Sequence, residues 1–334
     1  MDTAASPVGS DFAYGYGRVG VLQQQLLHRT DVDRLLATSS DAELPQVLAN
    51  IPFTSVVMPL ERMEQFTVAM EAWLKRELAH LSPEGKADVF DILWLREDLP
   101  VIAHLLKEYH GHTSGLTAPT KDSVTAYPYR MLRAQIFESG HRELPEDIAH
   151  FLEEMKARKN LRPDQIDHDV AVFIAAKQVE LAKASGSTLI LRYVKHIIDL
   201  QNVRTARRVH PGQDTSELFL EGGEINPRRI TTNVREIAML IHGSTLPSIV
   251  AEGIGDDSGS VLMLERTLNK GLAHDIAQMR SIPLSVEPIF AYGIMALSQI
   301  LMIRTILIGK SAGMSAAEIY SFLPPVFSTS IQES

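Results

Sequence analysis

The stretch IIDLQNVRTARRVHPG at residues 197–212 has the pattern of a long helix that stops at a Pro-Gly pair. At about 100° per residue its apolar side chains form one broad face. That face consists of Ile198, Leu200, Val203, Ala206 and Val209. Asp199 and Asn202 fall inside it. Because buried carboxylate and amide groups cost free energy unless they are hydrogen-bonded, the stretch predicts partners for these two side chains within the fold.

The same pattern occurs earlier in the chain. EDLPVIAHLLKEYHG places Asp98 thirteen residues before Gly111, and the opening stretch places Asp199 thirteen residues before Gly212. A repeat at this interval indicates that one structural unit is used more than once. Glycine at the end of both copies is typical of a helix stop.

A third copy follows in SQILMIRTILIGKSAG. Here Gln299 takes the aspartate position, Ala312 takes the glycine position with Gly313 next, and Arg304 lies opposite Arg204. Because the aspartate is lost, we expect the third copy to be held mainly by apolar packing.

Three short phrases, ELPQVLANI, ELPEDIAHFL and TLPSIVAEGI, begin at residues 43, 143 and 245, so their intervals are 100 and 102 residues. Each predicts a short helix with proline in its first turn, where the missing N–H does no harm. An amphipathic helix is predicted after each phrase, near residues 59, 167 and 262. Sustained period-2 alternation is absent from the sequence, so an all-α class is predicted, with helical repeats at residues 1–112, 113–222 and 223–334. The junctions are expected at residues 111–123 and 221–229.

The composition narrows the function classes. Of 334 residues, 45% are hydrophobic, which suffices for real cores, and none is cysteine, which excludes disulfides, thiolate metal sites and a cysteine nucleophile. The net charge of −9 argues against nucleic acid as the main partner, although RTARR is locally basic. The N-terminal stretch has neither a basic start nor an apolar core of signal-peptide length, so we do not expect export.

The segment PIFAYGIMALSQILMIRTILI at residues 288–308 is long enough to cross a membrane. Arg304 argues against a crossing, because arginine costs about 2.5 to 3.5 kcal/mol at the centre of a bilayer. The segment is also the third copy of a helix whose first two copies have the pattern of a water-soluble protein. The segment therefore predicts the most buried long helix of the fold.

Several short phrases imitate catalytic signatures. IGKS at residue 308 lacks the earlier glycine of a phosphate-binding loop and follows a helix instead of a strand. GIGDDSGS at residue 253 lacks the third glycine of a dinucleotide loop and is interpreted as a surface loop with helix-capping aspartates. His104, His110 and His112 have no carboxylate or cysteine that would complete a metal site, and an exposed helix end is favoured. We predict no catalytic residue, cofactor or metal.

Asp98 and Asp199 could in principle act as a general acid and base. They stand, however, at equivalent positions of different copies. A residue that recurs once in each structural unit is more simply interpreted as having a structural role in that unit. Together with Asn202 they are predicted to bind exposed backbone groups at the end of a neighbouring helix.

At these residues the sequence resembles the C subunit of V-type (A-type) ATPase/synthases, which is related to the eukaryotic d subunit. The family's D-L-x-N-[IL]-[KR]-T-x-x-R phrase is matched by Asp199, Leu200, Asn202, Val203, Arg204, Thr205 and Arg208. The start FAYGYGRVGVLQQQLL is similar to a Y-x-Y-x-x-A-R-V-x-x-L helix of the family, and the ending from residue 287 is similar to its Y-x-x-x-x-E-x-E-I-x-N-x-R-x-I pattern followed by G-K. The resemblance spans residues 12 to 323.

The chain departs from the family pattern at both ends. Ser298, Gln299 or Met302 stands where the family has glutamate or asparagine. Gly15, Gly17 and Gly20 occupy a helix that is normally richer in alanine, and each costs about 1 kcal/mol of helix propensity.

The resemblance implies three helical domains related by a pseudo-threefold axis and forming a funnel. It implies a non-catalytic central-stalk (rotor) subunit that couples the membrane proteolipid ring to the shaft of D and F subunits during proton or sodium transport. The chain would then be cytoplasmic and peripheral on the inner face of the cell membrane, bound through the ring, without nucleic acid. Its structural motif would comprise Asp98, Asp199, Asn202, Arg204, Arg208 and Arg304.

Two alternatives remain open at this point. A soluble α-helical protein-binding scaffold unrelated to rotary ATPases would use the repeat to hold a peptide or protein partner. An enzyme would require a polar pocket shared between the repeats.

Overall fold

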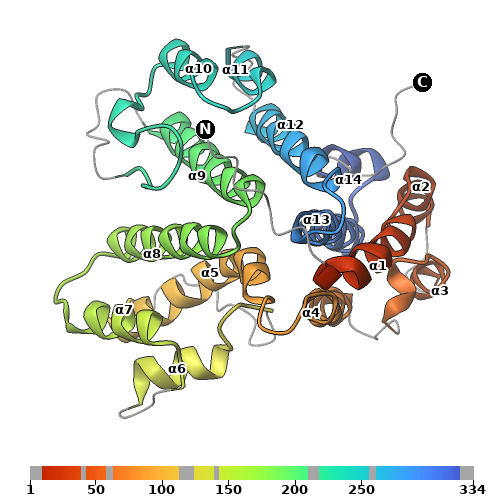
Figure 1. The fold of residues 1–334 in the computed structure, drawn as a ribbon, viewed down its shortest axis with the longest axis horizontal. Helices are drawn as coiled ribbons and strands as arrows, with labels where there is room; N and C mark the ends of the chain where they lie inside the picture. Colours follow the sequence, from red (N-terminus) through yellow and green to blue (C-terminus); the bar gives the residue numbers. More distant parts are fainter. Residues whose placement is uncertain are drawn as a thin grey trace. The chain divides into compact units, whose positions relative to one another are not determined.

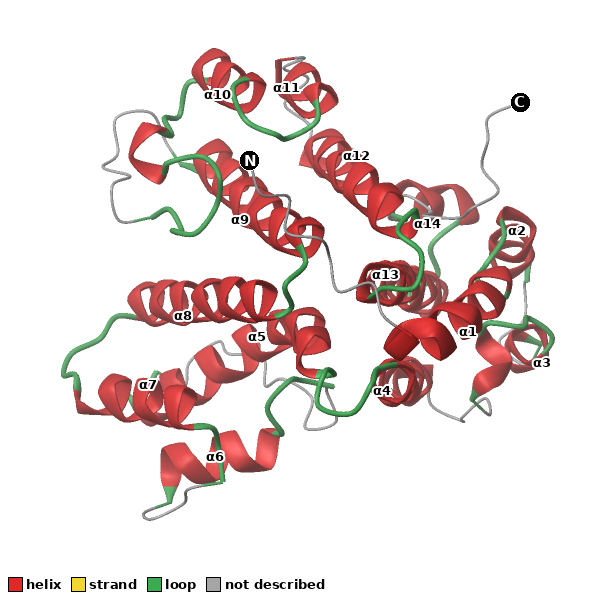
Figure 2. Ribbon diagram, viewed as in Figure 1, coloured by secondary structure: helices red, strands yellow, loops and turns green. Residues whose placement is uncertain are grey.

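The computed structural model describes residues 10–38, 43–57, 63–112, 124–138, 143–209, 218–255 and 261–323. Within these ranges every regular element is a helix and no strand occurs (Figure 2). The predicted all-α class is therefore confirmed for the described part of the chain. The chain divides into two compact units, each built from several separate segments.

Unit 1 combines residues before α5, the first turn of α9 and the chain from Asn233 onward. Its helices, labelled in Figure 1, are α1 (Ala13–Gln24), α2 (Arg29–Ala37), α3 (Leu44–Ala49), α4 (Met63–Leu81), α10 (Val234–His242), α11 (Ser248–Gly255), α12 (Val261–Arg280), α13 (Val286–Ser311) and α14 (Ala316–Phe322). Short 3₁₀ turns are η1 (Ser10–Phe12), η2 (Thr54–Val56) and η3 (Asp88–Phe90).

Unit 2 contains α5 (Asp91–Tyr109), α6 (Tyr129–Phe137), α7 (Glu146–Ala157) and α8 (Pro163–Ala184). It also contains α9 (Thr188–Arg208) from Val194 onward and the 3₁₀ turn η4 (Pro227–Arg229). Apolar residues of α5, α6, α7 and α8 form its core, and each of these helices contributes a fully buried side chain, namely Ile102, Leu132, Ile148 and Val170. The side-chain amide of Gln178 on α8 donates to the carbonyl of Ile92 on α5 at 3.1 Å, which fixes these two helices in register.

One order of helices recurs three times along the chain. A short helix begins at Arg29, Tyr129 and Val234, and a long helix begins at Asp91, Thr188 and Val286. Between them lie α3 and α4, α7 and α8, and α11 and α12. The helix order thus follows the period seen in the sequence, while the three domain boundaries stay a prediction.

The long helices α5 and α13 end next to the glycines that the sequence predicts as helix stops. Gly111 has φ +81° and Gly313 has φ +72°, the left-handed conformation that glycine adopts without strain. In α5 the N–H groups of Gly111 and His112 donate to carbonyls of the last turn, and Gly313 and Met314 do the same in α13. Gly212, the predicted end of α9, lies outside the described residues, as do residues 113–123 of the first junction.

The leucine-proline phrases do begin short helices, but the proline position differs from the prediction in two of them. Pro45 lies in the first turn of α3. Pro145 is instead the N-cap of α7, and Pro247 directly precedes α11. Proline before the helix still fits, because its fixed φ and missing N–H do not disturb the helical hydrogen bonds.

Helix α13 forms the centre of unit 1, where it packs against α1, α4, α12 and α14 (Figure 1). Of its 26 residues, 18 are buried. Among the described residues this is the one helix long and apolar enough to span a membrane by length and composition, with a mean hydropathy of 1.7 and 61% of that window buried. Phe290 in its first turns stacks on Phe90 and meets the ring of Tyr193 edge-on, so the residue before α5 and the first turn of α9 share its core.

Candidate functional site

The polar side chain that the sequence analysis singled out on α5 binds the backbone before α6. Asp98 is fully buried, and its two carboxylate oxygens accept hydrogen bonds from the backbone N–H groups of Ala126 at 2.7 Å and Tyr127 at 3.1 Å. Tyr127 immediately precedes Pro128, the N-cap of α6. Because bonds from N–H groups to a carboxylate are stronger than neutral ones, this contact fixes the entrance to α6. We name such a contact, between a polar side chain of a long helix and the backbone before a shorter helix, a clasp.

The Asp199 clasp has the same geometry on α9. The carboxylate of Asp199 accepts from the N–H groups of Glu224 at 2.9 Å and Ile225 at 3.1 Å, and Ile225 immediately precedes Asn226, the N-cap of η4. Asp98 and Asp199 therefore each accept hydrogen bonds from the backbone N–H groups of the two residues that directly precede an N-cap.

Asn202 binds the same loop one helical turn further along α9. Its side-chain amide donates to the carbonyl of Leu220 at 2.8 Å, and its oxygen accepts from the N–H of Leu220 at 2.7 Å. Both residues are buried, and the single side chain of Asn202 satisfies the backbone N–H and the backbone carbonyl of Leu220. The structure thus brings Asp199 and Asn202 together on residues 218–226.

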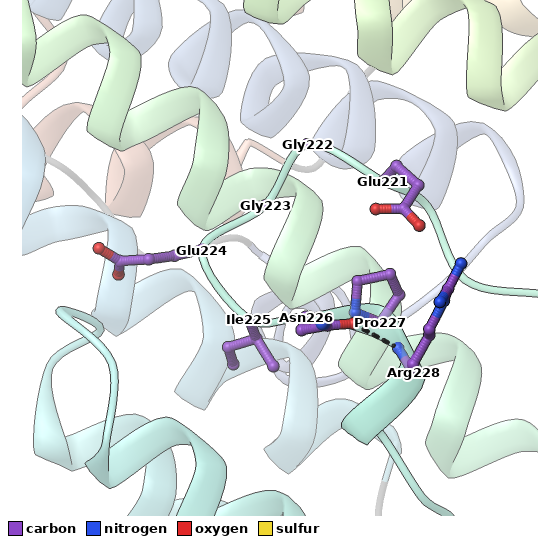
Figure 3. Close-up of a pocket in the computed structure, with 8 residues that line it drawn as sticks. All are labelled: Glu221, Gly222, Gly223, Glu224, Ile225, Asn226, Pro227 and Arg228. Carbon is purple, nitrogen blue, oxygen red and sulfur yellow. Dashed lines mark hydrogen bonds between the residues drawn. The ribbon is translucent and has the colours of Figure 1, made fainter.

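Close contact with Asp199 requires glycine in this loop. A Cβ atom added to Gly223 would lie 2.0 Å from Oδ1 of Asp199, closer than any real Cβ contact, and Gly222 has φ +99°. A shallow pocket is lined by residues 221–228, and in Figure 3 Glu224 points to one side of the loop while Glu221 and Arg228 lie on the other. All the lining residues are consecutive, so the pocket is formed by this turn, and the N–H of Arg228 donates to the side chain of Asn226 within it.

The carboxyl group of Asp199 is electrostatically unusual. Burial raises its pKa to about 6, although the two loop N–H groups act in the opposite direction. His196, which is buried on the same helix, lowers this pKa, and Glu224 raises it. The ring of His196 lies 3.8 Å from the carboxylate of Glu224, measured from Nε2 to Oε2.

The third copy has a clasp as well, in addition to the mainly apolar packing that we expect for it. The fully buried Gln299 accepts from the N–H of Leu27 at 2.7 Å and donates to the carbonyl of Leu27 at 3.2 Å. Leu27 immediately precedes His28, the N-cap of α2. An amide can donate and accept at once, so it satisfies a residue that offers both groups. α13 therefore holds the N-terminal part of the chain by a neutral clasp.

The three predicted arginines differ in their surroundings. Arg304 pairs with Glu71 of α4 at 2.6 Å and reaches the hydroxyl of Thr67 at 3.4 Å. Arg204 is half-buried on α9, and Arg208, the last residue of that helix, is exposed. Arg304 thus joins α13 to α4, within unit 1.

Described residues of the motifs that imitate catalytic signatures bind backbone carbonyls of other segments. The ammonium group of Lys310 in IGKS donates to the carbonyls of Leu36 at 3.0 Å and of Thr38, at the end of α2. His110 and His112 are half-buried, not exposed as expected, and their Nε2 atoms donate to the carbonyls of Met155 and Leu161. No group of three potential metal ligands occurs in the part of the chain that the structure describes. The aspartates of GIGDDSGS lie outside the described residues.

Sequence reasoning missed Gln299 and Gly223 as parts of the clasps. The repeat alignment had placed Gln299 at the aspartate position, and its ability to both donate and accept was the available signal. For Gly223 the signal was the Gly-Gly pair in EGGEIN. From the sequence this pair indicates a junction, and its packing against Asp199 becomes visible only in the structure.

Comparison with known proteins gives one match and one negative result. The family of ATP synthase (C/AC39) subunits matches residues 16–322, which is most of the chain. A search of curated proteins found no match. The matched region contains every clasp described above. The family is that of a V/A-type ATPase subunit, so membership implies association with that membrane-bound complex. The chain therefore belongs to the family of ATP synthase (C/AC39) subunits.

Proposed function

We propose that the protein is a non-catalytic central-stalk subunit of a V/A-type rotary ATPase. In this role it couples the membrane proteolipid ring to the shaft of D and F subunits during proton or sodium transport. The observation that carries the proposal is the family match over residues 16–322, together with three copies of one helical unit.

The clasps follow one order along the three repeats, which supports the view that the repeats are copies of one unit. α5 holds the segment before α6, and α9 holds the segment before η4, which leads toward α10. α13, in the last copy, holds Leu27 before α2, in the first copy. Each long helix thus holds the beginning of the following copy, and the last copy is joined back to the first.

The internal contacts of unit 1 suit a part that transmits torque. Arg192 at the start of α9 pairs with the buried Asp275 of α12 at 3.0 Å. Ser187 donates to the buried Glu287 of α13 at 2.7 Å. Buried polar groups that are held by hydrogen bonds resist displacement, because leaving a buried donor or acceptor without its partner costs about 1 to 3 kcal/mol. We propose that these contacts make the subunit stiff.

The same role places the protein at the cytoplasmic face of the membrane, bound through the ring. We do not assign a bilayer-spanning role to α13, since this helix is buried within unit 1. The alternative, a helical protein-binding scaffold unrelated to rotary ATPases, keeps the same fold and predicts indifference to the ring and the shaft.

Reconstitution tests the proposal directly. Vesicles carrying the complex without this chain should show ATP hydrolysis uncoupled from ion uptake, and adding the purified chain should restore uptake. The chain should also retain both the proteolipid ring and D/F when it is immobilised. As a control, the same chain denatured by urea should retain neither. A folded chain that binds neither component and restores no uptake would reject the rotor role and favour the scaffold.

A further inference from the structure

The chain passes between unit 1 and unit 2 at four places. Three of them fall between elements: residues 90 and 91 separate η3 from α5, residues 185 and 186 lie between α8 and α9, and residues 232 and 233 precede α10. The fourth falls between Tyr193 and Val194, inside α9. Among the described helices, α9 is therefore the one that both units share.

The first turns of α9 are fixed within unit 1. Ser187, directly before the helix, donates to the buried carboxylate of Glu287 on α13 at 2.7 Å. Arg192 pairs with the buried Asp275 of α12 at 3.0 Å and also donates to Gln278 of the same helix. The two anchors lie about one and a half turns apart along the helix. The start of α9 can therefore neither slide nor rotate without breaking one of them.

The rest of α9 is fixed within unit 2. Asp199 and Asn202 bind the backbone of residues 220–225 through the clasps described above. Ile198 and Val203 are buried on the same helix. Charged, neutral and apolar contacts thus attach this part of α9 to unit 2.

The sequence of α9 contains no point at which the helix would bend easily. Its 21 residues include neither proline nor glycine, the residues at which sharp kinks usually occur. At 1.5 Å per residue the helix is about 30 Å long. Tyr193 and Val194 are both buried, so a bend at the crossing would disturb the packing on either side of it.

We propose that α9 is a strut, that is, a stiff helix that carries force between the two units. Its start is held in unit 1 by Glu287 and Asp275, and its remainder is held in unit 2 by the clasps. The source of the force rests on the central-stalk function proposed above, whereas the stiffness of α9 is a property of the chain alone.

Distances between two spin labels on the full-length chain test the strut. The chain has no cysteine, so labels can be attached at the exposed positions Gln24→Cys in unit 1 and Glu154→Cys in unit 2. Lys195→Pro removes a hydrogen bond of α9 and clashes with the carbonyl four residues earlier, so the distance distribution should broaden at least about twofold. Lys195→Ala removes the same half-buried side chain and keeps the helix, so the width should stay that of the unmodified chain. Equal widths in these two variants would overturn the strut.

A second variant keeps the test decisive if Lys195→Pro fails to fold. Arg192→Met leaves α9 intact and releases its anchor on α12, so the same pair of labels should again give a broader distribution. A control pair within unit 2, Glu154→Cys with the exposed Lys183→Cys, should keep its width in every variant. An unchanged width in Arg192→Met, or broadening of both pairs together, would contradict the strut.

Reconstitution with the other subunits separates the strut from the central-stalk function. Lys195→Ala should restore ion uptake as the unmodified chain does, while Lys195→Pro should allow ATP hydrolysis with less uptake for each ATP. Failure of the unmodified chain to restore uptake would count against the central-stalk function. Full restoration by the unmodified chain and by Lys195→Pro alike would count against the strut alone.

Discussion

Asp98 shows how one residue can fix the path of the chain. Its buried carboxylate serves the N–H groups of Ala126 and Tyr127, so removing it leaves polar groups without their charged acceptor. We expect Asp98→Ala to lower the free energy of unfolding by about 3 kcal/mol, since each bond to a charged group contributes about 1.5 to 3 kcal/mol. Urea denaturation would measure this loss. Asp164→Ala, at an exposed ion pair with Arg162, is the matched control and should leave the midpoint unchanged. Unaltered stability in Asp98→Ala, with loss of complex function, would indicate a functional site instead.

Gly223 tests the close packing of the Asp199 clasp. A Cβ atom there would lie 2.0 Å from the carboxylate, so Gly223→Ala must displace the loop or the side chain. We expect a loss of about 2 kcal/mol in the free energy of unfolding, within the range for overpacked sites.

Gly17 on α1 provides the matched glycine control. It is exposed, and nothing lies within 4 Å of an added Cβ atom, so Gly17→Ala should stabilise the chain by about 0.5 to 1 kcal/mol. Both variants can be compared by thermal unfolding at one pH. Equal effects of the two substitutions would mean that the loop does not pack on Asp199 as described.

At the scale of elements, the last turn of α13 holds the end of α2. Lys310 donates to the carbonyls of Leu36 and Thr38, groups that lack helical partners at the end of a helix and carry its negative dipole. We expect Lys310→Met to lower the free energy of unfolding by about 1 kcal/mol. Isothermal titration with ATP should show no binding to either form. Binding to the unmodified chain that disappears in Lys310→Met, without a change in stability, would revive the phosphate-loop interpretation.

The elements show which parts of the structure the sequence could predict. Helix type and the stops at Gly111 and Gly313 follow from local periodicity and backbone freedom, which act over a few residues. The partner of Gln299 could not be predicted, because Leu27 lies 272 residues away and the side chain alone does not reveal whom it binds. The same applies to Gly15 on α1, where an added Cβ would lie 2.3 Å from the carbonyl oxygen of Leu81. Such close approaches depend on tertiary packing, not on the local sequence.

In the whole molecule, the boundaries of the sequence repeats differ from the boundaries of the two compact units. The repeat counts helices in chain order, whereas the compact units collect helices that pack together. Unit 2 therefore takes α5 from the first copy and α6 to α8 from the second. The clasps explain the difference in physical terms, because a long helix binds the segment that begins the following copy. Family membership adds what no single element could, namely the complex in which the chain works.

The whole molecule also decides whether α13 meets lipid. In unit 1 this helix buries 18 of its 26 residues, and its Arg304 is paired with Glu71. Transfer to a bilayer would expose the apolar faces of α1, α4 and α12 and would strand the arginine, at a cost of several kcal/mol. We therefore expect alkaline carbonate to release the chain from membranes of the assembled complex, while the proteolipid stays in the pellet as an internal control. Chain that remains with the proteolipid after carbonate, and that is protected from protease on both sides of α13, would show that this helix spans the bilayer.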